Sequence, residues 1–214
     1  MNDVRPTVLI IDDSPEDTET FRVYLRAGFE ILTADRGDRG LALASANRPD
    51  CVLLDYQLPD MTALEFFAER GEGHDDDYAV IVLTGHMDAA LAVECMKQGA
   101  HDFLTKGRIS SDTLQRAVTN GIEKVAMRRQ VTAQQLDIEQ SRHLFYDLFD
   151  FSPDAIVMTN REGLIRLMNR VAERLFGWSY EEVAGQPVEV LMPQSARRQH
   201  PAQRTRYLES PSER

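Results

Sequence analysis

The sequence predicts an α/β domain built on a five-stranded parallel sheet with helices on both faces, followed by a long helix and a smaller α+β module. Short apolar runs alternate with helical patterns from residue 7 to residue 111, which is typical of consecutive βα units. Crossover connections between parallel strands are right-handed, so these units place helices on both faces of the sheet. After Ser152-Pro153 the alternation stops and a hairpin pattern begins.

In the first module, each apolar run is followed closely by a helical pattern. Cys51-Val52-Leu53-Leu54 is apolar throughout, as expected for a strand that is buried on both faces of a parallel sheet. Ser14-Pro15 supplies an N-cap and a first-turn proline for the first helix. We expect strands over residues 7–11, 30–34, 51–54, 78–83 and 101–104, and helices over 15–26, 36–46, 62–70, 87–98 and from 111 onward.

The segment over residues 114–149 contains no proline and a single glycine, Gly121. Its apolar residues recur at intervals of three, four and their multiples, which predicts one continuous helix. The middle of the segment is polar, with Arg128, Arg129, Thr132 and Gln135. A coiled-coil seam there would be imperfect. We expect the helix to pair with a second copy in a homodimer; a connector surrounded by solvent is the alternative.

The second module begins with two strand patterns joined by Asn160-Arg161-Glu162-Gly163, a hairpin turn signal. The expected strands cover 155–159 and 164–168, and the expected helices cover 169–176, 179–184 and a basic stretch near 194–208. Two strands make an incomplete sheet. We therefore expect a first domain over 1–125, a helical linker over 126–148 and an incomplete α+β module over 149–214.

Composition limits the location and partners of the protein. Hydrophobic residues make up 43% of the 214 residues, which excludes a wholly disordered chain. The net charge of −11 argues against nucleic-acid binding, because phosphate contacts need clustered Lys and Arg. Cys51 and Cys95 lie in apolar surroundings without CxxC spacing, as reduced core cysteines do. The early run Val8–Ile11 is too short for a membrane span. We expect a cytoplasmic protein with no membrane or nucleic-acid partner.

Chemically active side chains follow four of the expected strands: Asp12 and Asp13, Asp55, Thr84, and Lys106 just beyond the fifth. The carboxyl ends of parallel strands meet at one edge, where open α/β sheets bind their ligands. Three carboxylates there repel one another unless a cation lies among them, and Mg²⁺ is the expected one. The set predicts a phosphoryl-acceptor site with Asp55 as nucleophile, Lys106 neutralising phosphoryl oxygens and Thr84 donating a hydrogen bond.

Residues 7 to about 125 resemble the receiver domain of two-component response regulators, which has a flavodoxin-like fold. The matching motifs are Asp12-Asp13, Asp55 followed by Leu58-Pro59, Val82-Leu83-Thr84-Gly85, Gly99-Ala100, and Phe103 before Lys106. The resemblance implies phosphotransfer to Asp55 from a histidine kinase or phosphotransfer protein. It also implies a metal ligand from the backbone carbonyl of Gln57, and a switch in which Phe103 turns inward when Thr84 moves.

Further expectations concern residues around the acceptor. Gln57 and His86 would flank a water that attacks the phosphoryl-aspartate, so we expect them to tune its lifetime. The sequence departs from the family at Ala63, where a glycine is usual, and at Gly107, where a proline usually follows the lysine. We therefore expect the loop after the fifth strand to follow another path, with an effect on the placement of Lys106.

The chain from about Phe145 onward resembles the first half of a PAS sensor domain. The matching segments are Ser152-Pro153-Asp154-Ala155-Ile156, Asn169, Glu173-Arg174-Leu175-Phe176-Gly177-Trp178, Gly185-Gln186-Pro187 and Leu191-Met192-Pro193. The last three strands of that family are missing. The run from Met192 to His200 also resembles oxygen-sensing PAS domains, which implies His200 as a candidate haem ligand. His143 lacks the surroundings of a kinase phosphoacceptor and is expected on the helix surface.

Two other functions remain open. A Mg²⁺-dependent phosphohydrolase could use the same Asp55 nucleophile, although Gln57 stands where such enzymes have an acid/base aspartate. A PAS ligand or haem sensor with a silent receiver is the third hypothesis. Our leading expectation is a phosphorelay module that is not itself an enzyme, although it could dephosphorylate itself. Phosphorylation of Asp55 would bias the long helix and the PAS unit, which would control an output domain such as a kinase or cyclase.

Overall fold

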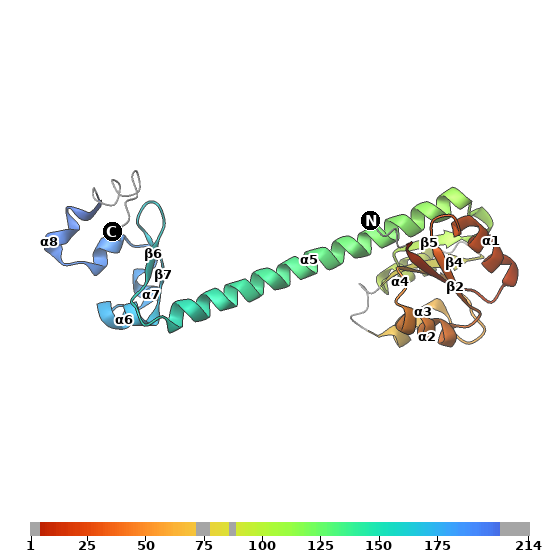
Figure 1. Ribbon diagram of the computed structural model, residues 1–214, viewed down its shortest axis with the longest axis horizontal. Helices are drawn as coiled ribbons and strands as arrows, with labels where there is room; N and C mark the ends of the chain where they lie inside the picture. The colour runs from red at the N-terminus through yellow and green to blue at the C-terminus, as the bar shows by residue number, and fades with distance from the viewer. Residues whose placement is uncertain (1–4, 72–77, 86–88, 202–214) are drawn as a thin grey trace. The chain divides into compact units, whose positions relative to one another are not determined.

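A computed structural model describes residues 5–71, 78–85 and 89–201 of the chain. Its internal contacts divide the chain into two compact units, Met1–Gln134 and Gln135–Arg214, which are described separately. Figure 1 labels most of the helices and strands. No helix within the described ranges is both long enough and apolar enough to cross a membrane. The boundaries expected for the three parts of the chain, and its cytoplasmic location, stay predictions.

The first unit contains one five-stranded parallel sheet with the strand order β2-β1-β3-β4-β5. The strands are β1 (Thr7–Ile11), β2 (Glu30–Ala34), β3 (Cys51–Asp55), β4 (Ala79–Thr84) and β5 (Asp102–Thr105). The helices are α1 (Pro15–Leu25), α2 (Gly37–Asn47), α3 (Ala63–Arg70), α4 (Ala89–Lys97), the 3₁₀ turn η1 (Lys106–Arg108) and the start of α5 (Ser111–Phe151). The predicted fold class is confirmed, and β3 extends one residue further than predicted to include Asp55.

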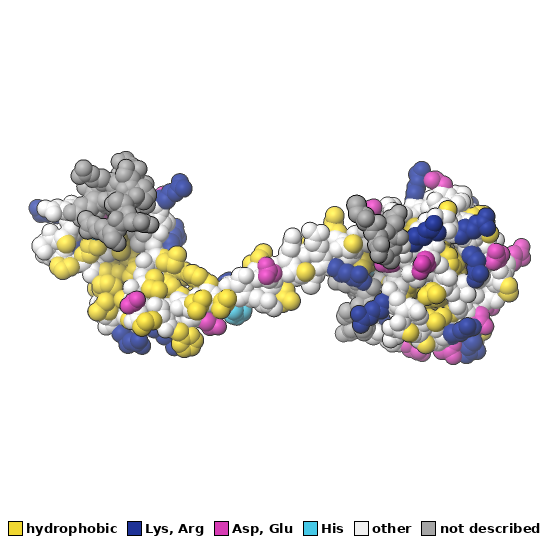
Figure 2. Space-filling model, viewed as in Figure 1, with side chains coloured by type: hydrophobic (Ala, Val, Ile, Leu, Met, Phe, Trp, Pro, Cys, Tyr) yellow, Lys and Arg dark blue, Asp and Glu magenta, His cyan; other side chains and the backbone are white. Residues whose placement is uncertain are grey.

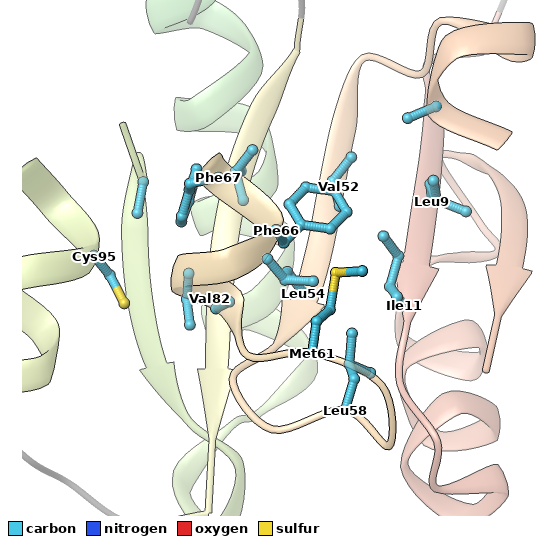
Figure 3. Packing of buried hydrophobic residues seen from close by; sticks show 14 of the residues in the cluster. Leu9, Ile11, Val52, Leu54, Leu58, Met61, Phe66, Phe67, Val82 and Cys95 are labelled. Carbon is cyan, nitrogen blue, oxygen red and sulfur yellow. The ribbon is translucent and has the colours of Figure 1, made fainter. Parts of the chain in front are cut away.

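The sheet is buried on both faces because helices cover each of them. Side chains from α2, α3 and α4 pack on one face together with alternate residues of β1, β3 and β4. Side chains from α1 and α5 pack on the other face. In Figure 3, Phe66 of α3 lies against Val52 and Leu54 of β3. Gly40 allows α2 to approach β1, since a Cβ atom there would lie 2.4 Å from Cδ1 of Ile11.

Strand register determines which side chains meet at the carboxyl edge of this sheet. Ile11 pairs with Leu54, so Asp12 and Asp55 directly follow neighbouring paired positions on β1 and β3. Asp55 in turn pairs with Leu83, the residue before Thr84 on β4. Because the strands are parallel and adjacent, the three polar residues lie at one edge.

The helix α5 runs without a break from Ser111 to Phe151, which confirms the predicted long helix. Within the first unit, Leu114, Val118 and Val125 are buried against the sheet. Every side chain from residue 126 to residue 148 is exposed. None of the described side chains in this middle part belongs to the apolar core of either unit.

The second unit is built around a two-stranded antiparallel sheet of β6 (Val157–Thr159) and β7 (Ile165–Met168). Its other elements are α6 (Arg170–Phe176), α7 (Tyr180–Val183), the 3₁₀ turn η2 (Val188–Leu191) and α8 (Gln194–Arg197). The predicted hairpin turn is formed by hydrogen bonds from Leu164 N and Gly163 N to Asn160. The predicted basic helix over 194–208 ends its first segment at Arg197, and its part beyond residue 201 lies outside the described residues.

Asn169 connects the end of α5 to the rest of the second unit. Its side chain is completely buried and makes four hydrogen bonds. Nδ2 donates to the carbonyls of Phe149 in α5 (3.0 Å) and Asp154 (2.9 Å). Oδ1 accepts from Ile156 N and from Ala172 N, the latter capping α6. This one amide therefore joins α5, the segment before β6 and α6, while the unit's own apolar core is small.

We predict that Asn169→Ala destabilises the second unit by about 2–4 kcal/mol, because several buried backbone groups lose their partner at once. Urea unfolding followed by the fluorescence of Trp178, the one tryptophan of the chain, reports on this unit. Asn47→Ala, at an exposed position in the first unit, serves as the control. An unchanged Trp178 transition in Asn169→Ala would show that the amide does not hold the unit together.

Candidate functional site

Three carboxylates form a cluster at the carboxyl edge of the first unit's sheet. One oxygen from each of Asp12, Asp13 and Asp55 lies within 4.8 Å of the others. Asp12 and Asp55 are buried, whereas Asp13 is exposed. Three hard oxygen ligands at this spacing suit a small divalent cation such as Mg²⁺, with water completing its shell. The residues that the sequence analysis assigned to the metal thus meet, except that the structure does not test the carbonyl of Gln57.

Asp12 is the most enclosed of the three acids. Its side chain Oδ1 accepts the backbone N–H of Ser14 at 3.0 Å, and Oδ2 lies 2.7 Å from the ammonium of Lys106. Burial raises the pKa of Asp12 above its usual value, and the contacts with Lys106 and Ser14 offset only part of this effect. Lys106 therefore neutralises only part of the negative charge of the three carboxylates.

Lys106 is the cationic centre of the site. Its Nζ atom lies 2.7 Å from Asp12 Oδ2, 2.8 Å from Asp55 Oδ2 and 3.0 Å from Asp17 Oδ2. Burial alone would lower the pKa of Lys106, but the hydrogen bonds to Asp12, Asp55 and Asp17 outweigh it and raise the pKa. One ammonium is shared by three carboxylates, which keeps it charged and leaves each acid only partly neutralised.

Gly107 lies in the loop that carries Lys106, and no comparison tests whether this loop follows another path than in the family. Residues Lys106–Arg108 form the 3₁₀ turn η1, closed by a hydrogen bond from Ile109 N to Lys106 O. The peptide bonds of the described residues are all trans. The long lysine side chain nevertheless reaches both Asp12 and Asp55, so the substitution at residue 107 does not remove Lys106 from the site.

Asp17 is a site residue that sequence reasoning missed. It is the third residue of α1, and its backbone N–H donates to the Ser14 side chain that caps this helix. The start of α1 at Ser14-Pro15 was predicted, and it places Asp17 in the first helical turn beside the sheet edge. The sequence could thus predict that Asp17 lies in the first turn of α1, but not that its carboxylate contacts Lys106.

The remaining predicted residues lie around this centre. Thr84 is the last residue of β4 and is buried, with 7% of its surface exposed. Phe103 in β5 is partly buried and packs against the apolar core on the sheet face covered by α2, α3 and α4. Gln57 is exposed, and its backbone N–H donates to Asp55 Oδ1 at 3.4 Å. His86 lies outside the described residues, so its role stays a prediction.

His200 lies in the second unit, where its Nδ1 atom is 2.9 Å from Oε1 of the buried Glu189. The ring is thus fixed to η2 by a carboxylate. Haem binding through His200 is not tested by this contact and stays a prediction. His143 is exposed on α5, as expected.

Comparison with known proteins decides the family. A sequence model described as "Response regulator receiver domain" matches residues 8–119 of the chain. The chain belongs to the response regulator receiver family. A second model, described as "PAS fold", matches residues 142–214. The first unit is therefore a receiver domain of the two-component type, and α5 leads from it into a PAS region.

Individual relatives agree with this assignment. The C4-dicarboxylate transport transcriptional regulatory protein DctD of Pseudomonas aeruginosa is 34% identical over 122 residues, 56% of this chain and 26% of that protein. The sensor histidine kinase TmoS of Ectopseudomonas mendocina is 25% identical to this chain. The alignment covers 96% of this chain and 24% of TmoS. The signal receiver domain of a putative LuxO repressor from Vibrio parahaemolyticus superimposes with a TM-score of 0.55 at 27% identity, covering 60% of this chain and 98% of that one. The chain thus spans about a quarter of the length of the two curated relatives named here.

Receiver domains bind Mg²⁺ in an acidic pocket, and the Asp12, Asp13 and Asp55 cluster fits that role. We predict that Mg²⁺ raises the unfolding temperature of the receiver and that Asp13→Asn removes most of this effect. A cation present at 100 times its Kd adds about 2.7 kcal/mol to stability. Without metal, Asp13→Asn should be at least as stable as the wild type, because it relieves repulsion among the carboxylates.

Calorimetry with and without Mg²⁺ measures both effects. Asp35→Asn, which removes one exposed charge elsewhere in the same domain, is the matched control. A Mg²⁺-induced shift of equal size in Asp13→Asn and in the wild type would remove Asp13 from the metal site.

Proposed function

We propose that this chain is the phosphoryl-accepting module of a two-component phosphorelay, with Asp55 as the residue that receives the phosphoryl group. One observation carries the proposal. The Asp55 carboxylate ends a central strand with Lys106 Nζ 2.8 Å from its Oδ2 atom and two further acids within metal-ligand distance. The immediate donor would be a histidine kinase or a phosphotransfer protein, and TmoS, the relative aligned over 96% of the chain, is named a sensor histidine kinase.

The chemistry is an in-line transfer between two nucleophiles. A carboxylate oxygen of Asp55 attacks phosphorus, the bond from phosphorus to the donor's imidazole nitrogen breaks, and the imidazole retains that electron pair and takes up a proton. Lys106 neutralises negative charge on the transferring oxygens, and the Thr84 hydroxyl donates to one of them. Bound Mg²⁺ would supply additional positive charge to the same oxygens.

The response to transfer would run through Thr84 and Phe103. Thr84 ends β4 and pairs across the sheet with Thr105, two residues after Phe103 on β5. A shift of Thr84 toward a phosphoryl group would leave space that the partly buried Phe103 ring can enter. Coupling of 1–3 kcal/mol, on the order usual between sites, is enough to bias α5. Gln57 and His86 would set the lifetime of the phosphorylated state.

The proposed module accepts one phosphoryl group per chain and is not a turnover enzyme. A Mg²⁺-dependent phosphohydrolase with the same nucleophile is less well supported, because Gln57 offers an exposed amide where an acid/base carboxylate would be needed. Steady turnover of a generic phosphate ester would favour the hydrolase. A haem sensor with a silent receiver would be revealed by a Soret band in the purified protein.

We predict that Asp55→Asn abolishes labelling of the protein by radioactive acetyl phosphate in the presence of Mg²⁺. The amide is a poor nucleophile, so incorporation should fall at least about 100-fold, the loss of a covalent nucleophile. Asp112→Asn removes an exposed acid of the same unit and should label normally. Acid-stable or undiminished labelling in Asp55→Asn would place the acceptor elsewhere.

We further propose that two chains pair through α5. Along this helix Val131, Ile138, Phe145 and Leu148 are exposed and follow a heptad spacing of seven and three residues. In Figure 2 hydrophobic side chains recur along the helix. In a parallel pair with this register, Asp137 of one helix faces Arg142 of the other, so the flanking charges are complementary.

We predict that Ile138→Glu shifts the protein from dimer to monomer, because two carboxylates would face each other in the centre of the seam. Sedimentation equilibrium over a range of protein concentrations measures the change, expected to be at least about 10-fold in the dimer Kd. Gln140→Glu adds the same charge at an outer position of the same helix and should leave the dimer unchanged. Equal behaviour of the two variants would argue for a monomeric connector.

A further inference from the structure

The acceptor site contains a fourth carboxylate whose role differs from that of the metal cluster. Asp17 Oδ2 lies 3.0 Å from Lys106 Nζ, but Asp17 is not among the three acids that can share a cation. It comes from α1, whereas Lys106 follows β5. The Asp17 side chain is 37% exposed, so it sits at the mouth of the site rather than beneath it.

The Lys106 ammonium donates hydrogen bonds to Asp17 and Asp55, and Asp12 Oδ2 forms a close ion pair with it at 2.7 Å. Two of these partners, Asp12 and Asp55, are also the acids that would bind a divalent cation. A cation there engages their oxygens and repels the nearby ammonium. Asp17 is then the one partner among the three that still offers its full charge to Lys106.

The backbone around Lys106 gives the side chain little other support. Gly107 follows it directly, and a Cβ atom built at Gly107 would meet nothing within 4 Å. The turn η1 is short and its residues are not buried. The position of the ammonium therefore depends on its side-chain partners rather than on a packed loop.

Asp17 is itself held firmly enough to act as such a partner. Its N–H is bonded to the capping side chain of Ser14 at 3.3 Å. The next residue, Thr18, bonds through its hydroxyl to the carbonyl of Asp12 at 3.5 Å. The first turn of α1 is thus tied to the end of β1, which carries the metal ligands.

We propose that Asp17 is a positioning residue that keeps the Lys106 ammonium beside Asp55 when a divalent cation occupies the carboxylate cluster. The proposal rests on phosphoryl acceptance by Asp55 and adds to it a residue that acts through Lys106. Asp17 touches neither the transferring group nor the metal. Asp17 holds the ammonium in the site when Asp12 and Asp55 bind the cation, and so prevents Lys106 from moving into solvent.

The first test follows Lys106 itself, with Mg²⁺ alone and no phosphoryl donor. Reductive methylation of lysines, quantified by mass spectrometry, reports how accessible each ammonium is, with the exposed Lys97 and Lys124 as internal references. In the wild type, Lys106 should stay protected when Mg²⁺ is added. In Asp17→Asn, Mg²⁺ should speed its modification roughly fivefold or more, as expected for loss of a charge-assisted hydrogen bond. Glu16→Gln makes the same charge change at the neighbouring exposed residue and should behave as wild type.

The second test measures phosphorylation by acetyl phosphate at saturating Mg²⁺ together with Mg²⁺ affinity by calorimetric titration. Asp17→Asn should label roughly fivefold more slowly, while its Mg²⁺ affinity is not weakened, because the metal ligands are intact. Asp17→Glu restores a carboxylate within reach and should recover most of the rate. A merely structural role would instead weaken Mg²⁺ binding along with labelling, since α1 is tied to Asp12.

The outcomes separate this proposal from the proposed function. If the wild-type protein accepts no phosphoryl group, the proposed function is wrong. The methylation experiment still tests the role of Asp17 in that case. Labelling of Asp17→Asn at the wild-type rate, or protection of Lys106 that is unchanged by Mg²⁺ in this variant, overturns the positioning role. So does an equal loss in Asp17→Asn and Glu16→Gln, which would indicate a general charge effect.

Discussion

The parallel pairing of β1, β3 and β4 is the constraint on which the receiver site depends. Adjacent parallel strands end at one edge, so residues that are far apart in the sequence become neighbours there. The pairs Ile11–Leu54 and Asp55–Leu83 align Asp12, Asp55 and Thr84 to within one residue. A sheet buried on both faces holds that alignment rigidly. The alignment also brings the carboxylates together, and their mutual repulsion is reduced by the Lys106 ammonium and favours binding of a divalent cation.

Much of the receiver was predictable because its signals are local. Fully apolar runs marked β1, β3 and β4, and the Ser14-Pro15 start marked α1, so the order of strand ends could be inferred. The contact between Asp17 and Lys106 was not, because it depends on how α1 is rotated against a loop 89 residues away in sequence. No local pattern encodes that rotation. The sequence left the placement of Lys106 after Gly107 open, and the structure shows that the side chain reaches both Asp12 and Asp55.

The second unit was less predictable because its signals are weaker. Its apolar core has few residues, and its strands have three and four. Hairpin turn chemistry at Asn160 was visible in the sequence. The four hydrogen bonds of Asn169 were not, because three of them join backbone groups outside its own helix. The hydrogen bonds of Asn169 hold the end of α5 in the second unit, where hydrophobic burial alone is small.

The side chains of α5 between residues 126 and 148 are exposed. Helices in proteins are stabilised mostly by packing of an amphipathic face, so this stretch depends on its anchored ends and, in the proposed pair, on the second copy of α5. If the proposed coupling runs through α5, loosening either anchor would weaken it by lowering the helical population of this stretch, with no change at Asp55.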